Sequence, residues 1–250
     1  MSDKALLRQA FVDFITGYYD MIFGGFQKFS LIDYPGKICA IVFTQGCNFR
    51  CPYCHNPELV EFDRPDYAAP EENEIISFLE KRKGKLDALT VTGGEPLLHS
   101  DLDTFLTRVK ELGYLIKLDT NGSLPSGLEN VIQNRLIDYI AMDVKAPIGK
   151  YSEVVRARID TDKILRSINL IMDSGLEYEF RTTVVKDLLC KDDILKIGPL
   201  VHNACLYVLQ KFVPSKTLDK EFINSPGYSD EEMEEFRKMM EGFVSTCVVR

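Results

Sequence analysis

Several features that define large protein classes are missing from this 250-residue sequence. It has no uncharged apolar run near the roughly 18 residues that a membrane-spanning helix needs, so we expect no membrane span. Residues 1–10 have no basic segment leading into a long apolar stretch, so we expect no signal peptide. Internal repeats and Pro-, Gly- or Ser-rich linkers are also missing, and 45% of the residues are hydrophobic. This composition is typical of a globular chain with a sizeable core.

Positive charge is also scarce. Thirty Lys and Arg residues stand against 38 Asp and Glu, which gives a formal net charge of −8. A protein that holds nucleic acid through its phosphates needs a basic face, so we expect no nucleic-acid partner. The seven cysteines are an odd number and follow no secretory signal. We therefore expect free thiols and a cytoplasmic location, not a disulfide framework.

Short buried strands alternate with amphipathic helices along most of the chain. The apolar pattern predicts strands at residues 37–44, 88–92, 114–118, 138–144, 177–185 and 205–209. Because a buried strand followed by a helix is the unit of a parallel sheet, the pattern predicts about six β-α units. Six units are fewer than the eight of a full barrel. A doubly wound sheet also fits, and we take as the predicted α/β fold a partial (β/α)6 TIM-like barrel with parallel strands and outer helices.

The first residues do not follow this alternation. Residues 1–24 are rich in aromatic side chains and end at a pair of glycines. We predict that they form an N-terminal extension, a helix or hairpin that packs on the body of the protein. Residues 25–250 are predicted to form a single domain.

Three cysteines lie close together after the first predicted strand. Cys47, Cys51 and Cys54 are spaced Cys-x3-Cys-x2-Cys, on a loop at the end of the strand where parallel α/β folds bind ligands. Zinc would need a fourth ligand, and His55 is poorly placed because it directly follows Cys54. A [4Fe–4S] cluster with three protein ligands would leave one iron open for chemistry. The cluster is the favoured interpretation, and zinc remains the alternative.

A second motif follows the next predicted strand. Gly93, Gly94 and Glu95 stand between a threonine and a proline. Two glycines let a backbone approach a ligand closely, and a neighbouring carboxylate can pair with an ammonium group. Alone, the motif also fits a surface turn, but its position one unit after the cysteines favours a shared site.

Together these motifs resemble the radical S-adenosylmethionine (radical SAM) superfamily, in which an aromatic residue, here Tyr53, precedes the last cysteine. The resemblance implies that SAM binds the open iron of a [4Fe–4S] cluster. It implies that an electron from the reduced cluster cleaves SAM to methionine and a 5′-deoxyadenosyl radical that abstracts hydrogen. It also implies that the backbone of Tyr53 lies against the adenine, and that Gly93, Gly94 and Glu95 contact the cofactor, with the Glu95 carboxylate on its amino group.

The ends of two further predicted strands resemble one particular family within this superfamily. The third and fourth predicted strands end in the sequences LDTNG and MDVK, which resemble glycyl-radical-enzyme activating enzymes. The resemblance implies a monovalent cation site at Asp119, Thr120 and Asp143, a cofactor contact by Asn121, and a contact between Lys145 and the cofactor carboxylate. Oxygen ligands suit a hard cation, and an ammonium suits a carboxylate. A turn-forming Asp119 and a solvated Lys145 are the ordinary alternatives.

Arg181 lies inside a predicted strand between apolar residues. It either points at the bound cofactor, as the resemblance implies, or pairs with a carboxylate of the scaffold. The activating enzymes have a histidine after the sixth strand, where this chain has the sequence LQKF from residue 209. The contact made at that position is therefore left open.

Residues 25–37 and 54–59 resemble the activating proteins of anaerobic ribonucleoside-triphosphate reductases, and the likeness spans about residues 24–215. It implies one radical SAM domain that abstracts a glycine hydrogen from a glycyl-radical enzyme, here an anaerobic ribonucleotide reductase. A flavodoxin- or ferredoxin-type electron donor is implied as well. No cysteine lies between Cys54 and Glu95, so we expect one cluster. The same chemistry on a different glycyl-radical enzyme, a peptide or a small molecule is the alternative.

Overall fold

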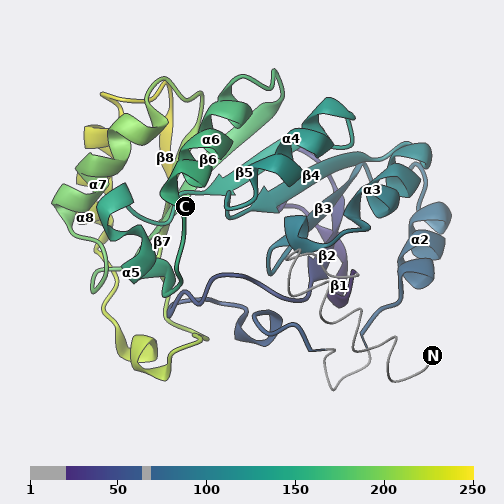
Figure 1. Ribbon diagram of the computed structural model, residues 1–250, viewed down its shortest axis with the longest axis horizontal. Helices are drawn as coiled ribbons and strands as arrows, with labels where there is room; N and C mark the ends of the chain where they lie inside the picture. The colour runs from purple at the N-terminus through teal and green to yellow at the C-terminus, as the bar shows by residue number, and fades with distance from the viewer. Residues whose placement is uncertain (1–20, 64–68) are drawn as a thin grey trace.

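The computed structural model describes residues 21–63 and 69–250. Their strands form one curved sheet whose spatial order is the order of the chain (Figure 1). β1 is antiparallel to β2, and every later strand is parallel to the one before it. The strands are β1 (Phe23–Ser30), β2 (Cys39–Thr44), β3 (Ala88–Gly93), β4 (Leu115–Thr120), β5 (Tyr139–Asp143), β6 (Glu177–Val184), β7 (Tyr207–Lys211) and β8 (Cys247–Val249).

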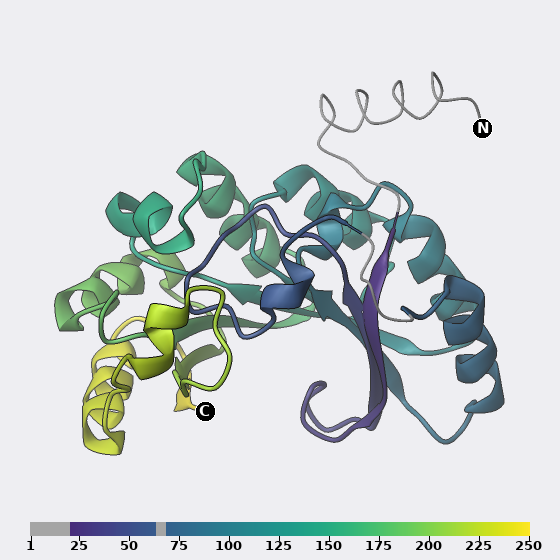
Figure 2. The same cartoon turned by 90° about the horizontal axis from the view of Figure 1, so that it is seen from below.

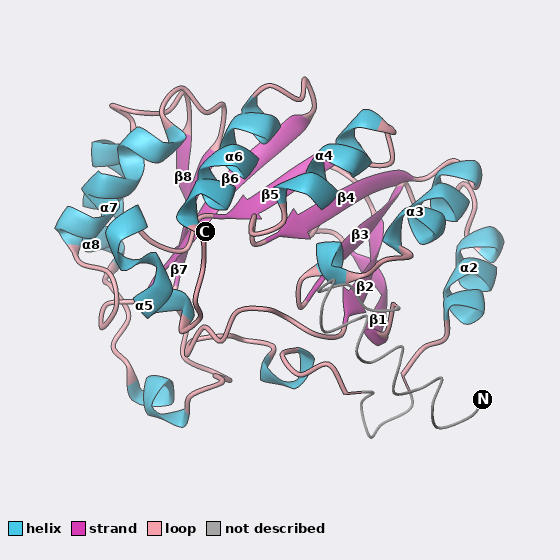
Figure 3. Cartoon of the chain, viewed as in Figure 1, coloured by secondary structure: helices cyan, strands magenta, loops and turns pink. Residues whose placement is uncertain are grey.

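Helices follow the outer side of this sheet (Figure 3). They are α2 (Glu72–Lys81), α3 (Leu102–Glu111), α4 (Pro125–Gln133), α5 (Tyr151–Val155), α6 (Thr161–Met172), α7 (Lys191–Ile197) and α8 (Asp230–Met240). Short 3-10 helices lie between them: η1 (Pro57–Leu59), η2 (Pro96–Leu98), η3 (Ile148–Lys150), η4 (Gly198–Val201) and η5 (Lys220–Asn224). No helix of the described ranges is both long and apolar enough to cross a membrane.

The predicted α/β fold is confirmed. The six predicted strands correspond to β2 to β7, and helices follow most of these strands as the predicted β-α units require. The sequence did not predict β1, α5 or β8. Residues 1–20, most of the predicted extension, lie outside the described residues, and Phe23 and Gly24 belong to β1. The division into an extension and a single domain therefore stays a prediction.

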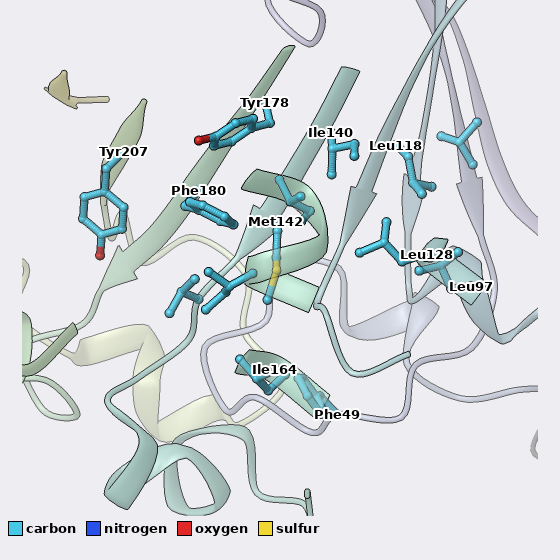
Figure 4. Close-up of a cluster of buried hydrophobic side chains, with 14 of the residues drawn as sticks. Phe49, Leu97, Leu118, Leu128, Ile140, Met142, Ile164, Tyr178, Phe180 and Tyr207 are labelled. Atoms are coloured by element: carbon cyan, nitrogen blue, oxygen red, sulfur yellow. The ribbon is translucent and has the colours of Figure 1, made fainter. Parts of the chain in front are cut away.

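The strands have two different faces, because successive side chains of a strand point to opposite sides. The face toward the helices carries the main core, and the opposite face carries a smaller apolar cluster together with polar and charged residues. Leu118, Met142 and Phe180 belong to the main core together with Leu128 of α4 and Ile164 of α6. Figure 4 shows these side chains between the strands and the helices. The residues next to them in β4, β5 and β6 point the other way, toward the open side of the sheet.

The segment after β2, which carries the three cysteines, crosses that open side (Figures 1 and 2). We call residues 45–63 the cysteine loop. The chain that leaves β3 is hydrogen-bonded to β2 and to this loop: Gly94 N donates to Thr44 O of β2 at 2.9 Å, and Glu95 N donates to Gly46 O of the loop at 2.9 Å. A Cβ on Gly94 would collide with the carbonyl of Gly46. The second glycine of the motif is therefore required for the contact between the loop and the sheet.

A methyl group at position 94 should push the cysteine loop away from β3. We expect Gly94→Ala to lower the free energy of unfolding by about 1–3 kcal/mol, the usual cost of overpacking, as measured by chemical denaturation. Gly149→Ala is the matched control, because a Cβ there meets no atom within 4 Å, and it should change that free energy by at most about 0.5 kcal/mol. Equal stability of the two variants would contradict the close contact.

Candidate functional site

A cavity of about 250 Å³ lies between the cysteine loop and the carboxyl ends of the central strands. Every site residue predicted from the sequence lines it, with the exception of Glu95. These residues are Cys47, Cys51, Tyr53, Cys54, Gly93, Gly94, Asp119, Thr120, Asn121, Asp143, Lys145 and Arg181. The fold thus brings four separate sequence motifs to one place.

The three cysteines present their thiols to this cavity from one loop. The sulfur of Cys47 accepts hydrogen bonds from the backbone N–H of Phe49 at 3.4 Å and from Nδ2 of Asn121 at 3.9 Å. Burial raises the pKa of Cys47 to about 12, that of Cys51 to about 11, and that of Cys54 as well. Because metals bind thiolates, iron has to displace these protons when the site is filled.

The arrangement of the thiols discriminates between the two metal interpretations. In the described part of the chain, no three His, Cys, Asp or Glu side chains are placed to hold one metal ion. Zinc needs such convergence on a single point. In a cuboidal iron–sulfur cluster each thiolate binds a different iron, so three thiols around one cavity suffice. The three cysteines fit a [4Fe–4S] cluster with three protein ligands, whereas a structural zinc site takes four.

Glu95 differs from the other predicted residues because its side chain is completely buried and lies outside the cavity lining. Its Oε1 accepts hydrogen bonds from Thr120 Oγ1 at 2.8 Å and Leu97 N at 3.2 Å, and its Oε2 accepts one from Asn121 N at 2.7 Å. Burial raises the pKa of Glu95 to about 7, although all three bonds favour the charged form. In this structure the carboxylate joins the ends of β3 and β4, and its contact with the cofactor amino group stays a prediction.

A chain of amides connects the end of β4 to the cysteine loop. Asn121 Nδ2 donates to Asn48 Oδ1 at 2.9 Å, and Asn48 Nδ2 donates to Ser123 Oγ at 2.8 Å. Ser123 N in turn donates to Asn121 Oδ1 at 2.9 Å. The side-chain amide of Asn121 is therefore hydrogen-bonded to the cysteine loop and to Ser123. The role of Asn48 was not predicted, because a lone asparagine between two cysteines carries no sequence signal of its own.

An ion network lines the wall of the cavity that the strands form. Arg181 bridges two carboxylates: its Nε donates to Asp143 Oδ1 at 3.0 Å, and its Nη1 donates to Asp119 Oδ2 at 3.2 Å. Lys117 pairs with Asp119 at 2.5 Å, and Lys145 pairs with Asp143 at 3.1 Å. The pairing with scaffold carboxylates is thus realised for Arg181, which also lines the cavity. Its contact with the bound cofactor stays a prediction.

The protonation of the carboxylates and of Lys145 in this network is set by the oppositely charged side chains beside them. Burial alone would raise the pKa of Asp119 and Asp143, but the neighbouring Arg181 and the lysines hold both pKa values below their usual range. Burial alone would lower the pKa of Lys145, but Asp143 raises that pKa well above its usual range. Asp119, Asp143 and Lys145 are therefore charged near neutral pH.

Gln210 lies in the sequence where the activating enzymes are expected to have a histidine. It belongs to β7 and lines the cavity together with Thr183 of β6, whose Oγ1 donates to Gln210 Oε1 at 3.4 Å. Thr183 was not predicted as a site residue, although its position two residues after Arg181 in a strand places both on one face. An amide at this place does not titrate, in contrast to a histidine.

The segment after β7 closes the outer wall of the site. Phe212 contacts the ring of His55 with centroids 5.6 Å apart and the ring of Tyr53 at 6.4 Å. The backbone N–H of Asp219 donates to the carbonyl of Pro52 at 2.9 Å. The cysteine loop is thus held from both sides, by β3 and by the chain that follows β7.

Comparison with known proteins shows the family to which the chain belongs. The family model described as the radical SAM superfamily matches residues 41–189. The fold is also that of SuiB from Streptococcus suis, whose structure was solved with S-adenosylmethionine, with a TM-score of 0.63 at 14% identity over 82% of this chain and 48% of that one.

Three curated relatives refine the assignment. A protein of Methanocaldococcus jannaschii, provisionally named a glycyl-radical enzyme activating enzyme, is 37% identical over 90% of this chain and 94% of its own length. The pyruvate formate-lyase-activating enzyme of Staphylococcus aureus is 26% identical over 71% of this chain and 74% of its own. The 7-carboxy-7-deazaguanine synthase of Methanothermobacter thermautotrophicus is 40% identical over 60% of this chain and 62% of its own. The chain therefore belongs to the radical SAM superfamily and, within it, to the family of glycyl-radical-enzyme activating enzymes.

Proposed function

We propose that this enzyme generates the glycyl radical of an anaerobic ribonucleoside-triphosphate reductase by abstracting a glycine hydrogen. The observation that carries the proposal is the single cavity in which three cysteines face Lys145 and Arg181. Likeness of residues 25–37 and 54–59 to reductase activating proteins supports the choice of partner. When bound, the [4Fe–4S] cluster and SAM supply the one-electron cleavage and the radical that removes hydrogen.

The residues of the cavity wall would bind and orient SAM. Lys145, which stays charged beside Asp143, presents an ammonium to the carboxylate of the cofactor. We propose that the backbone at Gly93 and Gly94, which line the cavity, contacts the cofactor, and that the backbone of Tyr53 lies against its adenine. Glu95 fixes the ends of β3 and β4 relative to each other, and we propose that it pairs with the amino group of SAM.

Two further statements complete the proposal. The cluster needs one electron for each turnover, and a flavodoxin- or ferredoxin-type protein is the donor that we propose. We also propose a cytoplasmic location, where a reducing environment keeps the seven thiols free.

Cluster binding by the cysteine loop gives the first test. After anaerobic reconstitution with iron and sulfide, we expect Cys51→Ala to lose the visible absorbance of the cluster and to form 5′-deoxyadenosine only at background level. Cys205→Ala is the control, because Cys205 is exposed and lies outside the cavity lining, and it should retain both. Formation of 5′-deoxyadenosine by Cys51→Ala at the wild-type rate would contradict the assignment of the ligands.

The identity of the partner is tested separately. The reconstituted, reduced enzyme is incubated with SAM and the anaerobic ribonucleotide reductase of the same organism, and the mixture is examined by electron paramagnetic resonance. We expect a glycyl radical signal on the reductase that disappears when its radical glycine is replaced by alanine. Cleavage of SAM without a radical on the reductase would contradict the choice of partner.

A small-molecule substrate is the second candidate, favoured by the 40% identity to a 7-carboxy-7-deazaguanine synthase. That relative is matched over only 62% of its own length, whereas the activating enzyme of Methanocaldococcus jannaschii is matched over 94%. The activase therefore remains the proposed function. Mass spectrometry of the same reaction mixtures for 7-carboxy-7-deazaguanine would reveal the other activity.

A further inference from the structure

The resemblance to activating enzymes implies a monovalent cation at Asp119, Thr120 and Asp143, and the structure tests whether these residues fit one. Such an ion needs several oxygen atoms that are free to converge on it. Here Thr120 Oγ1 donates its hydrogen to the Glu95 carboxylate at 2.8 Å. It also accepts a hydrogen bond from Gly122 N at 3.1 Å. The threonine hydroxyl therefore uses its hydrogen and one of its two lone pairs within the protein.

Every oxygen of the two carboxylates already faces a cationic side chain. Asp119 Oδ1 binds Lys117 at 2.5 Å, and its Oδ2 binds Arg181 at 3.2 Å. Asp143 Oδ1 binds Arg181 at 3.0 Å, and its Oδ2 binds Lys145 at 3.1 Å. Thr92 Oγ1 also donates to Asp119 Oδ2 at 3.2 Å. The donor set does not fit an added metal ion, because the guanidinium of Arg181 occupies the position between the carboxylates.

The backbone keeps Arg181 in this position. Arg181 on β6 is the direct register partner of Asp143 on β5, and Val144 N donates to the carbonyl of Arg181 at 2.8 Å. A guanidinium is a planar donor with a fixed fork, which can bond two carboxylates at once. The pairing of β5 with β6 thus places the guanidinium of Arg181 between the carboxylates, and no ion from solution is needed there.

The balance of charge leads to the same conclusion. Among the five directly paired groups, the three cations Lys117, Lys145 and Arg181 outnumber the two carboxylates by one. The carboxylate of Glu95 lies next to this group through its hydrogen bond to Thr120. Glu179 lies 3.9 Å from Arg181 but pairs with Arg250 at 2.9 Å, so this pair adds no net charge. The excess charge suits an incoming carboxylate, whereas another cation in this largely buried group would face repulsion that water screens poorly.

We propose that Arg181 is a positioning residue that takes the place of the monovalent cation between Asp119 and Asp143. The protein then binds SAM without requiring Na⁺ or K⁺. This inference depends on SAM as the cofactor and is independent of which protein receives the radical.

The first arm of the test uses the wild-type protein. The reconstituted enzyme, with no partner protein present, is titrated with SAM in buffers of equal ionic strength that contain K⁺, Na⁺ or tetramethylammonium as the only added cation. Tetramethylammonium is too bulky to lie between two carboxylates. We expect the three dissociation constants to agree within about twofold, and a value at least about tenfold lower in K⁺ or Na⁺ would overturn the proposal.

The second arm removes the bridge. In tetramethylammonium, Arg181→Gln should weaken SAM binding by about tenfold or more, as expected for the loss of charge-assisted bonds. K⁺ or Na⁺ should restore part of this loss. Arg166→Gln is the matched control, because Arg166 is an exposed arginine whose partner, Glu129, lies outside the cavity lining. If K⁺ or Na⁺ does not strengthen the binding of SAM to the Arg181→Gln variant, then Arg181 does not replace the ion.

A third readout is independent of the cofactor. Relaxation of ²³Na in solutions of the cluster-free proteins should detect bound sodium with Arg181→Gln and none with the wild type, and sodium bound by the wild type at this site would refute the proposal. Circular dichroism verifies that the variant is folded. If it is not, Arg181→Lys, which reaches one carboxylate at a time, replaces it, and the wild-type titrations still decide the question.

Discussion

The close backbone contact between the cysteine loop and the end of β3 is the constraint on which the site depends. Gly94 lies so near Gly46 that no side chain fits between them, and two backbone hydrogen bonds join the strands and the loop there. The same stretch of chain carries Glu95, whose carboxylate fixes the end of β4. The position of the cysteines relative to the strand ends is therefore set by covalent geometry and buried hydrogen bonds.

The alternation of side chains along β4, β5 and β6 places charged groups in the wall of the cavity. Apolar residues face the helices, while Asp119, Asp143 and Arg181 face the cavity from three neighbouring strands. Buried charges of this kind are tolerated only when they are paired, and here each carboxylate has two cationic partners. One positive charge remains for a ligand. The wall is thus prepared for a carboxylate before any cofactor binds, which reduces the reorganisation that binding requires.

Much of the fold could be predicted from the sequence, because local patterns of apolar residues encode its strands and helices. The alternation of apolar strands with amphipathic helices indicated the fold, and the cysteine spacing indicated the loop that carries the site. Most of the other predicted residues that line the cavity came from the resemblance of the strand-end motifs to activating enzymes. β1 was missed because its two adjacent glycines lower strand propensity and its pairing with β2 is a long-range effect. β8 has only three residues, too few for a periodic signal.

Side-chain direction is the other property that the sequence could not supply. A carboxylate beside two glycines suggests a ligand contact, yet Glu95 turns into the protein, since three donors from η2 and the β4 end meet it there. For Arg181 the flanking residues allowed two roles, and only the register of β5 and β6 shows that it lies beside Asp143. Such outcomes depend on which groups tertiary structure brings together.

An anaerobic crystal structure of the reconstituted enzyme with SAM tests the central claim most directly. We expect Cys47, Cys51 and Cys54 to bind three irons of one cluster, the SAM carboxylate to lie beside Lys145, and Arg181 to remain between Asp119 and Asp143. A metal ion between those two carboxylates, with Arg181 turned away, or a single zinc on the cysteines, would contradict it.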